Sequence, residues 1–369
     1  MSMRHSFGTV TAAAVFVVFA AAGTSFAQQP TPTPALDRRG LPLPFGVQPY
    51  YMPDVPLGTG PYKAIMSEEK GLARQIVYYP KDLARLGGKK LPILLWANGS
   101  CLYAGNRYRQ FLTEIASHGY LVVAGGPMGD KELEVGPQQN PAVRGGGPGA
   151  AAAQPPSPAR GGAGAAAAGP QTPARGGVDA GTAPVAGRVT AEIMKEGLDW
   201  AFARNADSSS PLYGKVDTQH VVMMGHSCGG AVAIEVATTD PRVTALGVWA
   251  SGFGLIGRGN NDPGVAQKVR GPVLVISGTE ALDIAYGSAK RTFDELNNNP
   301  VFYAWRDDMA HIGTFGAANG GELGRLAVNW LEWQTRGDQN AAKWFKGSGC
   351  TLCKDPAWHV QKKKIDKSS

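Results

Sequence analysis

The sequence predicts an α/β fold with a mainly parallel central sheet and helices on both of its faces. Short apolar runs recur along the chain, each bounded by Gly, Pro, Asn or Asp, as buried strands are. Between them lie segments whose apolar residues are three and four positions apart, which is typical of helices with one buried face. Strands that alternate with such helices form a parallel sheet covered on both sides. With 369 residues, of which 43% are hydrophobic and 18% charged, the chain can bury a core of this size.

The expected elements can be placed in order. Buried strands are predicted at 92–98 (PILLWAN), 120–126 (YLVVAGG), 220–225 (HVVMMG), 244–250 (TALGVWA), 272–277 (PVLVIS) and 300–305 (PVFYAW). Helices are predicted at 107–117, 190–204, 229–238, 287–297 and 321–335. Two further strands, near 62–68 and 74–80, precede the first crossover, and we expect them to form an antiparallel edge.

The N-terminus has the pattern of a secretory signal peptide, 1–27. Arg4 precedes an apolar run at 10–22, and Ser25 and Ala27 provide small residues at −3 and −1 of a cleavage site after Ala27. The apolar run is short for a membrane span, so we expect no stable membrane anchor. This pattern predicts a secreted or periplasmic protein.

The rest of the chain divides by composition. Residues 28–56 are rich in Pro and Gly and are expected to form an extended lead-in. The main domain is expected at 57–345, interrupted by an insertion at 140–187 made almost wholly of Ala, Gly, Pro, Gln and Arg. Such a composition offers few large apolar side chains, so we expect the insertion to be disordered. A C-terminal tail at 346–369 carries a C-x-x-C sequence and a basic end.

The net charge of +7 is concentrated outside the main domain. Arg4, the arginines of the 140–187 insertion and the lysines from Lys343 onward account for it, and the remainder is close to neutral. No basic stripe with interleaved aromatic residues is present, so nucleic acid is not an expected partner. We expect the lysine-rich tail to be a solvated terminus.

A G-x-S-x-G sequence lies between a predicted strand and a predicted helix, at Gly225-His226-Ser227-Cys228-Gly229. In that position it describes a sharp, strained turn that presents a serine, and only small neighbours allow strand and helix to pass so closely. This context favours Ser227 as a nucleophile over a serine in an ordinary turn.

A serine hydroxyl needs a histidine that accepts its proton, and His311 is the best candidate. It follows the predicted strand 300–305, in a loop at the same sheet edge as Ser227. The remaining histidines are His5, His118, His220, His226 and His359. His5 lies in the signal peptide, His118 before a strand and His220 at the far end of a strand. His226 lies in the turn itself, where its side chain should point in another direction, and His359 lies in the tail.

The carboxylate that orients the histidine is expected after the strand at 272–277. Asp283 is favoured because it can clear the strand end, and Glu280 is the alternative. The chain order Ser227, Asp283, His311 is the order of the α/β-hydrolases.

Residues 57–365 resemble a secreted α/β-hydrolase of the esterase type, near the dienelactone-hydrolase-like, cutinase-like and polyester-depolymerase-like branches. The resemblance is carried by GPYKA at 60–64, WANGSC at 96–101, GHSCGG at 225–230, DIAY at 283–286, GELGRLAVNWLEWQTRGD at 321–338 and CTLCKDPAW at 350–358. It implies an α/β-hydrolase fold, and it implies that the Asp of DIAY, Asp283, is the triad acid. Dienelactone hydrolases proper have a cysteine nucleophile, where this chain has Ser227.

The hydrolase fold predicts an oxyanion hole made of backbone N–H groups. One is that of Cys228, after the nucleophile. The other comes from the loop after the strand 92–98, where many relatives have His-Gly and this chain has Asn98-Gly99. Ser100 is the favoured second donor, with Cys101 as the alternative.

Four cysteines in an exported chain suggest disulfides, for which three connectivities exist. The fold brings Cys101 and Cys228 to the same sheet edge, so we expect them to pair with each other and Cys350 with Cys353. Free buried thiols are the alternative for the first pair, and a redox motif or a zinc site for the second.

The expected function is a serine hydrolase of carboxylic esters that needs no metal and no cofactor. The segment 251–271 is too short for a large helical lid, so an open site that accepts bulky or polymeric esters is expected. Trp249 and Phe253 either line a substrate pocket or belong to the core. A serine peptidase on the same fold and a non-catalytic binding protein are the alternatives, and the sequence does not predict the oligomeric state.

Overall fold

The computed structural model describes residues 58–130, 133–135, 187–255 and 264–367. The expected signal peptide at 1–27, the lead-in at 28–56 and all of the 140–187 insertion except Gly187 lie outside the described residues.

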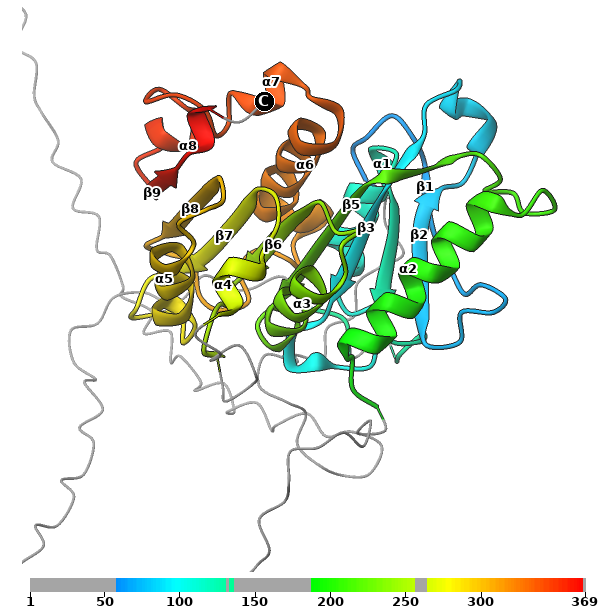
Figure 1. The fold of residues 1–369 in the computed structure, drawn as a ribbon, viewed down its shortest axis with the longest axis horizontal. Coiled ribbons are helices and arrows are strands. Elements are labelled where there is room, and N and C mark those ends of the chain that lie inside the picture. Colours follow the sequence, from blue (N-terminus) through cyan, green and yellow to red (C-terminus); the bar gives the residue numbers. More distant parts are fainter. Residues whose placement is uncertain (1–57, 131–132, 136–186, 256–263, 368–369) are drawn as a thin grey trace, which may run out of the picture.

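The described residues form one nine-stranded sheet in the order β1-β2-β4-β3-β5-β6-β7-β8-β9 (Figure 1). Its strands are β1 (Ala64–Ser67), β2 (Gln75–Pro80), β3 (Leu91–Ala97), β4 (Leu121–Gly125), β5 (Val216–His226), β6 (Ala245–Trp249), β7 (Val273–Gly278), β8 (Val301–Arg306) and β9 (Trp358–Lys363). In this order, the strands from β4 to β8 are parallel to one another. At the two edges, β1 pairs antiparallel with β2, β2 with β4, and β9 with β8. The predicted α/β fold class and its antiparallel first edge are confirmed.

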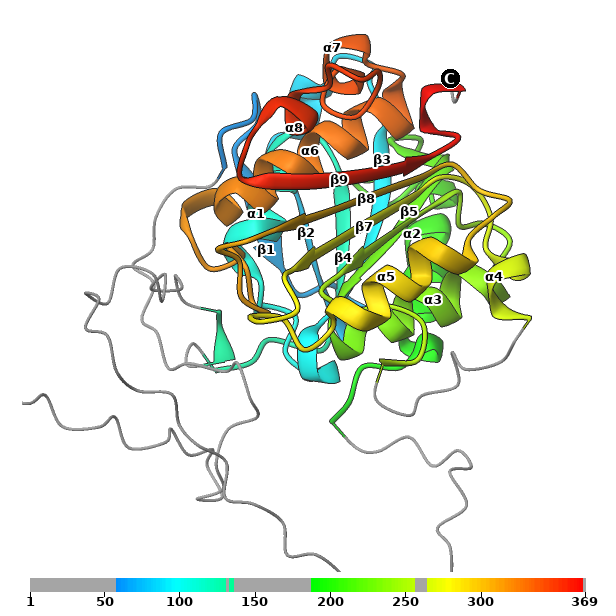
Figure 2. The ribbon, with the colours of Figure 1, turned by 90° about the vertical axis from the view of Figure 1, so that its left-hand side faces the viewer.

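Helices cover both faces of the sheet (Figure 2). The helices are α1 (Arg109–Ser117), α2 (Ala191–Ala206), α3 (Cys228–Thr239), α4 (Val265–Lys268), α5 (Tyr286–Glu295), α6 (Gly321–Arg336), α7 (Gln339–Ala342) and α8 (Thr351–Lys354). One face packs against α1 and α6, and the other against α2, α3 and α5. None of the helices in the described residues combines the length and the apolar character that a membrane span requires.

Strand β3 shows why its sequence is apolar throughout. Leu94 and Trp96 point into the core beneath α1 and α6, whereas Ile93 and Leu95 point into the core beneath α2 and α3. Successive side chains of a strand alternate between faces, so a strand covered on both sides needs an unbroken apolar run.

The end of the chain differs from the expected solvated tail. Residues Trp358–Lys363 form β9, which pairs antiparallel with β8. Trp358 is buried and its indole N–H donates to Glu322 Oε1 at 2.7 Å, and Ile365 is fully buried. The lysines of this segment lie on an edge strand, where charged side chains discourage pairing with another chain.

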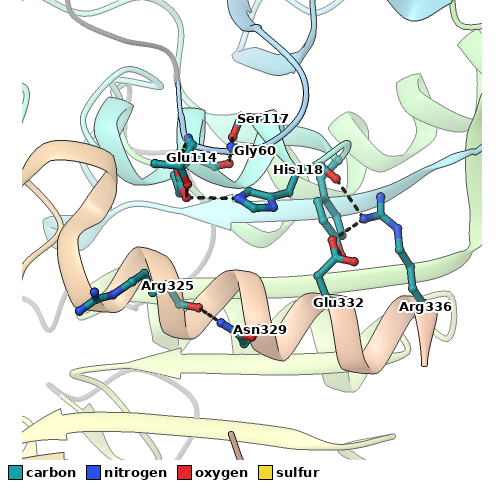
Figure 3. Close-up of polar contacts among 10 residues, drawn as sticks. Gly60, Glu114, Ser117, His118, Arg325, Asn329, Glu332 and Arg336 are labelled. Atoms are coloured by element: carbon teal, nitrogen blue, oxygen red, sulfur yellow. Dashed lines mark hydrogen bonds and ion pairs between the residues drawn. The ribbon is translucent and has the colours of Figure 1, made fainter. Parts of the chain in front are cut away.

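Polar contacts tie the start of the described chain and α6 to the end of α1 (Figure 3). The N–H of Gly60 donates to Ser117 Oγ at 2.9 Å, and His118 Nε2 lies 3.3 Å from Glu114 Oε1. Arg336 donates to the His118 carbonyl at 3.0 Å. A cavity of about 480 Å³ lies beside these groups. Because His118 ends α1 just before β4 begins, this cavity is at the amino ends of the parallel strands.

Candidate active site

Ser227 occupies a strained turn between β5 and α3. Its backbone angles are φ 53° and ψ −124°, a conformation that residues other than glycine rarely adopt. A Cβ on Gly229 would lie 2.1 Å from the Ala97 carbonyl oxygen, and one on Gly225 would lie 2.1 Å from that of Gly229. Both glycines are therefore required for strand and helix to approach this closely, as the G-x-S-x-G sequence indicated.

The structure brings Ser227, His311 and Asp283 together at the carboxyl edge of the sheet. His311 Nε2 lies 2.8 Å from Ser227 Oγ, and His311 Nδ1 lies 2.7 Å from Asp283 Oδ1. Asp283 follows β7 and His311 follows β8, so strand ends deliver each side chain. Glu280, the alternative acid, is exposed. The geometry thus places Asp283, and not Glu280, against the histidine.

The Asp283 carboxylate is held in its charged form. Burial alone would raise its pKa, but the hydrogen bond and charge of His311 and two backbone N–H groups outweigh burial, and the pKa lies below its usual value. Gly278 donates to Oδ2 and Ala285 to Oδ1, each at 2.9 Å. A charged, fixed carboxylate holds the proton of His311 on Nδ1 and leaves Nε2 to accept from Ser227.

The loop after β3 supplies the second strained segment of the site. Ser100 and Cys101, in the 3₁₀ turn Gly99–Cys101, have φ of 59° and 49°. The N–H of Cys101 already donates to the Asn98 carbonyl at 3.0 Å. Among the described residues, the N–H groups of Ser100 and Cys228 donate to no protein acceptor. Of the two alternatives for the second oxyanion donor, the geometry therefore favours Ser100.

Both expected disulfides are present. Cys101 is bonded to Cys228 with a Cα–Cα distance of 5.2 Å, and Cys350 is bonded to Cys353 with 4.9 Å. The first bond joins the turn that carries Ser100 to the first residue of α3. It therefore links the two segments that carry the oxyanion candidates.

Sequence reasoning missed the role of Asn98. This residue is fully buried, and its Nδ2 lies 2.9 Å from the carbonyl oxygens of both Leu102 and Ala104 and 2.7 Å from that of Gly125. The amide thus anchors the loop 98–104, which contains the turn Gly99–Cys101 and which we call the oxyanion loop after its candidate donors, to the end of β4. A polar residue directly after a fully apolar strand was the available signal, because buried amides are kept where they are hydrogen-bonded.

His226 was also set aside by the sequence analysis as a histidine that leaves the turn in another direction. Its ring is buried beside His311, where Nε2 lies 2.7 Å from the carbonyl oxygen of His311 and Nδ1 lies 2.7 Å from Tyr108 Oη. Burial, and then the neighbouring His311, lower its pKa to about 3. His226 is therefore neutral at neutral pH.

Trp249 and Phe253 belong to the core. Their exposed fractions are 1% and 0%, and the Trp249 ring packs edge-on against Phe111 and Phe315. Of the two alternatives for these residues, burial favours the core, although Trp249 also borders a small hollow beside His311. Ile284, which follows Asp283 in the chain, has 67% of its surface exposed.

Residues 182–349 match the PETase family, described as PET hydrolase-like. The matched segment includes Ser227, Asp283, His311 and Cys228, and it ends before β9. A comparison with curated proteins finds no match to this chain. The match confirms the resemblance to the polyester-depolymerase-like branch of the α/β-hydrolases and supports ester hydrolase activity.

Proposed function

We propose that this protein is an exported serine hydrolase that cleaves carboxylic esters, polyesters among them, through a covalent acyl-enzyme. The observation that carries the proposal is the unbroken hydrogen-bond chain from Ser227 Oγ through His311 to Asp283, with distances of 2.8 and 2.7 Å. The chain ends on a strained serine next to two N–H groups that have no protein acceptor among the described residues.

In the acylation step, Ser227 Oγ attacks the carbonyl carbon of the ester while its proton moves to His311 Nε2. Asp283 stabilises the imidazolium that forms, because its carboxylate accepts the Nδ1 proton. The negative oxygen of the tetrahedral intermediate is bound by the N–H groups of Cys228 and Ser100. The intermediate then expels the alcohol, which takes the proton from His311, and the acyl group stays on Ser227.

In the deacylation step, a water molecule gives its proton to His311 Nε2 and attacks the acyl carbonyl. The same two N–H groups bind the second oxyanion. Its collapse returns the proton to Ser227 Oγ and releases the carboxylic acid. Each group thus acts twice, and the chain supplies every proton acceptor that the reaction needs.

The proposed substrate class rests on the family match and on the surface beside the triad. The matched family is described as PET hydrolase-like, and Ile284 exposes apolar surface next to Asp283. Such a surface suits a bulky or polymeric ester. Export is proposed from the signal-peptide pattern at 1–27 and is supported by the two disulfides, which persist in oxidising compartments.

The test is an ester panel with matched serine variants. Purified protein is assayed on p-nitrophenyl esters, polyester film and peptide anilides. Ser227→Ala should abolish ester turnover with little change in Tm, because the hydroxyl acts in chemistry. Ser277→Ala is the control, since Ser277 is equally a buried serine at a strand end and its hydroxyl contacts Tyr303 Oη at 3.3 Å.

Three outcomes would contradict the proposal. Turnover that survives in Ser227→Ala would remove the nucleophile. Peptide anilide cleavage in place of ester cleavage would favour the serine peptidase alternative. Absence of labelling by a fluorophosphonate probe in the wild-type protein would favour a non-catalytic scaffold.

A further inference from the structure

A second hydrogen-bond chain runs beside the triad and joins its two loops. The N–H of Gly99 donates to Tyr108 Oη at 3.1 Å, Tyr108 Oη lies 2.7 Å from His226 Nδ1, and His226 Nε2 lies 2.7 Å from the carbonyl oxygen of His311. Gly99 precedes Ser100, the favoured oxyanion donor. The chain therefore connects the oxyanion loop at one end with the backbone of the catalytic histidine at the other.

The direction of every proton in this chain follows from its partners. A carbonyl oxygen only accepts, so His226 Nε2 carries the proton that it donates to His311. Because the neutral ring has one proton, Nδ1 is an acceptor, and Tyr108 must donate to it. The same hydroxyl oxygen accepts from Gly99, and burial raises the pKa of Tyr108, which keeps the hydroxyl protonated.

The surroundings confine both side chains, and Arg107 also interacts with Tyr108. Tyr108 is fully buried and His226 is 1% exposed, and the ring of Phe315 packs against both, with centroids 5.2 Å away. A Cβ on Gly99 would lie 2.4 Å from both His226 Nδ1 and Tyr108 Oη. Glycine at this position therefore lets the two side chains converge on the backbone of the oxyanion loop.

We propose that His226 and Tyr108 are positioning residues, which fix the backbone of His311 and the oxyanion loop in one mutual geometry. Neither side chain contacts the reacting atoms. His226 holds the peptide group from which the His311 side chain projects, and Tyr108 holds the peptide group next to the Ser100 donor. The kinetic consequences of this proposal rest on the proposed esterase function. The hydrogen-bond chain itself rests on geometry alone.

The kinetic test uses variants that remove the two links separately. His226→Phe keeps an aromatic ring in the buried space beside Tyr108 and Phe315 and removes both hydrogen bonds. His226→Gln keeps a donor that can reach the His311 carbonyl. Tyr108→Phe removes one hydroxyl only and is the mildest change. His118→Phe, at the opposite edge of the sheet, is the matched control for replacing a histidine.

His226→Phe should lower kcat by about 10- to 100-fold with little change in KM, because misplaced groups lose transition-state stabilisation. His226→Gln should recover most of that loss. The double variant Tyr108→Phe/His226→Phe should be no slower than His226→Phe, since both substitutions break one chain. A variant that only loosens the fold would instead lower Tm and leave kcat at low temperature unchanged.

The proposal is overturned if His226→Phe keeps the wild-type kcat or if His226→Gln fails to restore the rate. It is also overturned if the decreases in kcat caused by Tyr108→Phe and His226→Phe multiply in the double variant. Should His226→Phe fail to fold, Tyr108→Phe decides the matter by the same kcat criterion. A second readout does not depend on catalysis: ¹⁵N NMR of the wild-type imidazoles at pH 5 should show His226 neutral and protonated on Nε2. A charged His226 ring or the opposite tautomer would refute the proposed hydrogen-bond chain, even in a protein without esterase activity. Absence of esterase activity from a wild-type protein with the expected His226 tautomer would count only against the proposed function.

Discussion

Removal of the Cys101–Cys228 disulfide should lower both the free energy of unfolding and kcat. Removal of the Cys350–Cys353 disulfide is the matched control. Cys101 and Cys228 are 127 positions apart in the sequence, whereas Cys350 and Cys353 are 3 positions apart, so the first bond closes a much longer loop. In the chain-entropy account, these loops correspond to about 5 and about 2 kcal/mol of unfolding free energy. Cys101→Ala/Cys228→Ala should therefore lose about 3 kcal/mol more than Cys350→Ala/Cys353→Ala.

The catalytic effect has a different origin. Ser100 and Cys101 are both held at positive φ, a strained backbone that persists only while its surroundings hold it. Without the disulfide, the Asn98 amide and Tyr108 still hold this loop, so the donor at Ser100 becomes less well fixed but is not lost. Because loss of a whole oxyanion donor lowers kcat by about 100- to 1,000-fold, we expect a smaller decrease of about 10- to 100-fold.

The assay pairs urea unfolding with esterase kinetics on the same preparations. Each double variant is unfolded at 25 °C to obtain the free energy of unfolding, and kcat for p-nitrophenyl butyrate is measured at a temperature at which both variants are fully folded. The tail variant should keep its wild-type kcat, since its disulfide joins Cys353 of α8 to Cys350, the residue before α8, and neither cysteine belongs to the candidate site.

The reasoning is refuted in either of two ways. Equal losses of stability in the two double variants would show that loop closure does not govern the effect. An unchanged kcat in Cys101→Ala/Cys228→Ala would show that packing and the Asn98 amide alone hold the oxyanion loop.

Three further predictions concern the acid, the buried histidine and the insertion. Asp283→Asn should lower kcat by about 10⁴-fold while Glu280→Gln leaves it unchanged, which steady-state kinetics on one ester can check; the reverse pattern would make Glu280 the acid. Because the pKa of His226 falls from 6.5 to about 3 on folding, the unfolded state binds a proton that the native state does not below pH 6.5. The unfolding free energy of the wild-type protein should therefore decrease, relative to that of His226→Gln, by about 1.4 kcal/mol per pH unit between pH 6 and pH 4 in urea titrations, and parallel curves would contradict this. Replacement of 142–186 by a short Gly/Ser bridge should preserve Tm and small-ester turnover, and a loss of soluble protein would show that the segment contributes to the fold.

The sequence was most informative where one physical constraint dominates. A strand covered on both faces must be apolar throughout, so β3 to β8 could be predicted to within a few residues. Strand β9 was missed because an edge strand pairs on one side only and tolerates lysines, so residues 358–363 have the composition of a solvated tail.

The residues of the candidate site likewise differ in whether the sequence alone predicts them. Ser227 could be predicted because the close approach of β5 and α3 demands glycines at fixed positions, and those glycines are visible in the sequence. Tyr108 and His226 could not, because their roles depend on contacts between residues 118 positions apart, and no local pattern marks such a pair. Trp249 shows the same limit: an aromatic residue at a strand end is equally compatible with a pocket wall and with the core.

Two of the contacts that hold the oxyanion loop lie at opposite ends of the turn Gly99–Cys101. Tyr108 holds it at Gly99, and the disulfide holds it at Cys101, so Ser100 lies between two fixed points. The chain also returns to this loop at Val189, whose N–H donates to the Cys101 carbonyl at 2.9 Å. That contact is made two residues beyond the 140–187 segment, within the described part of the chain. A strained donor supported from three sides costs no reorganisation when the oxyanion forms, which is the property that makes such donors effective.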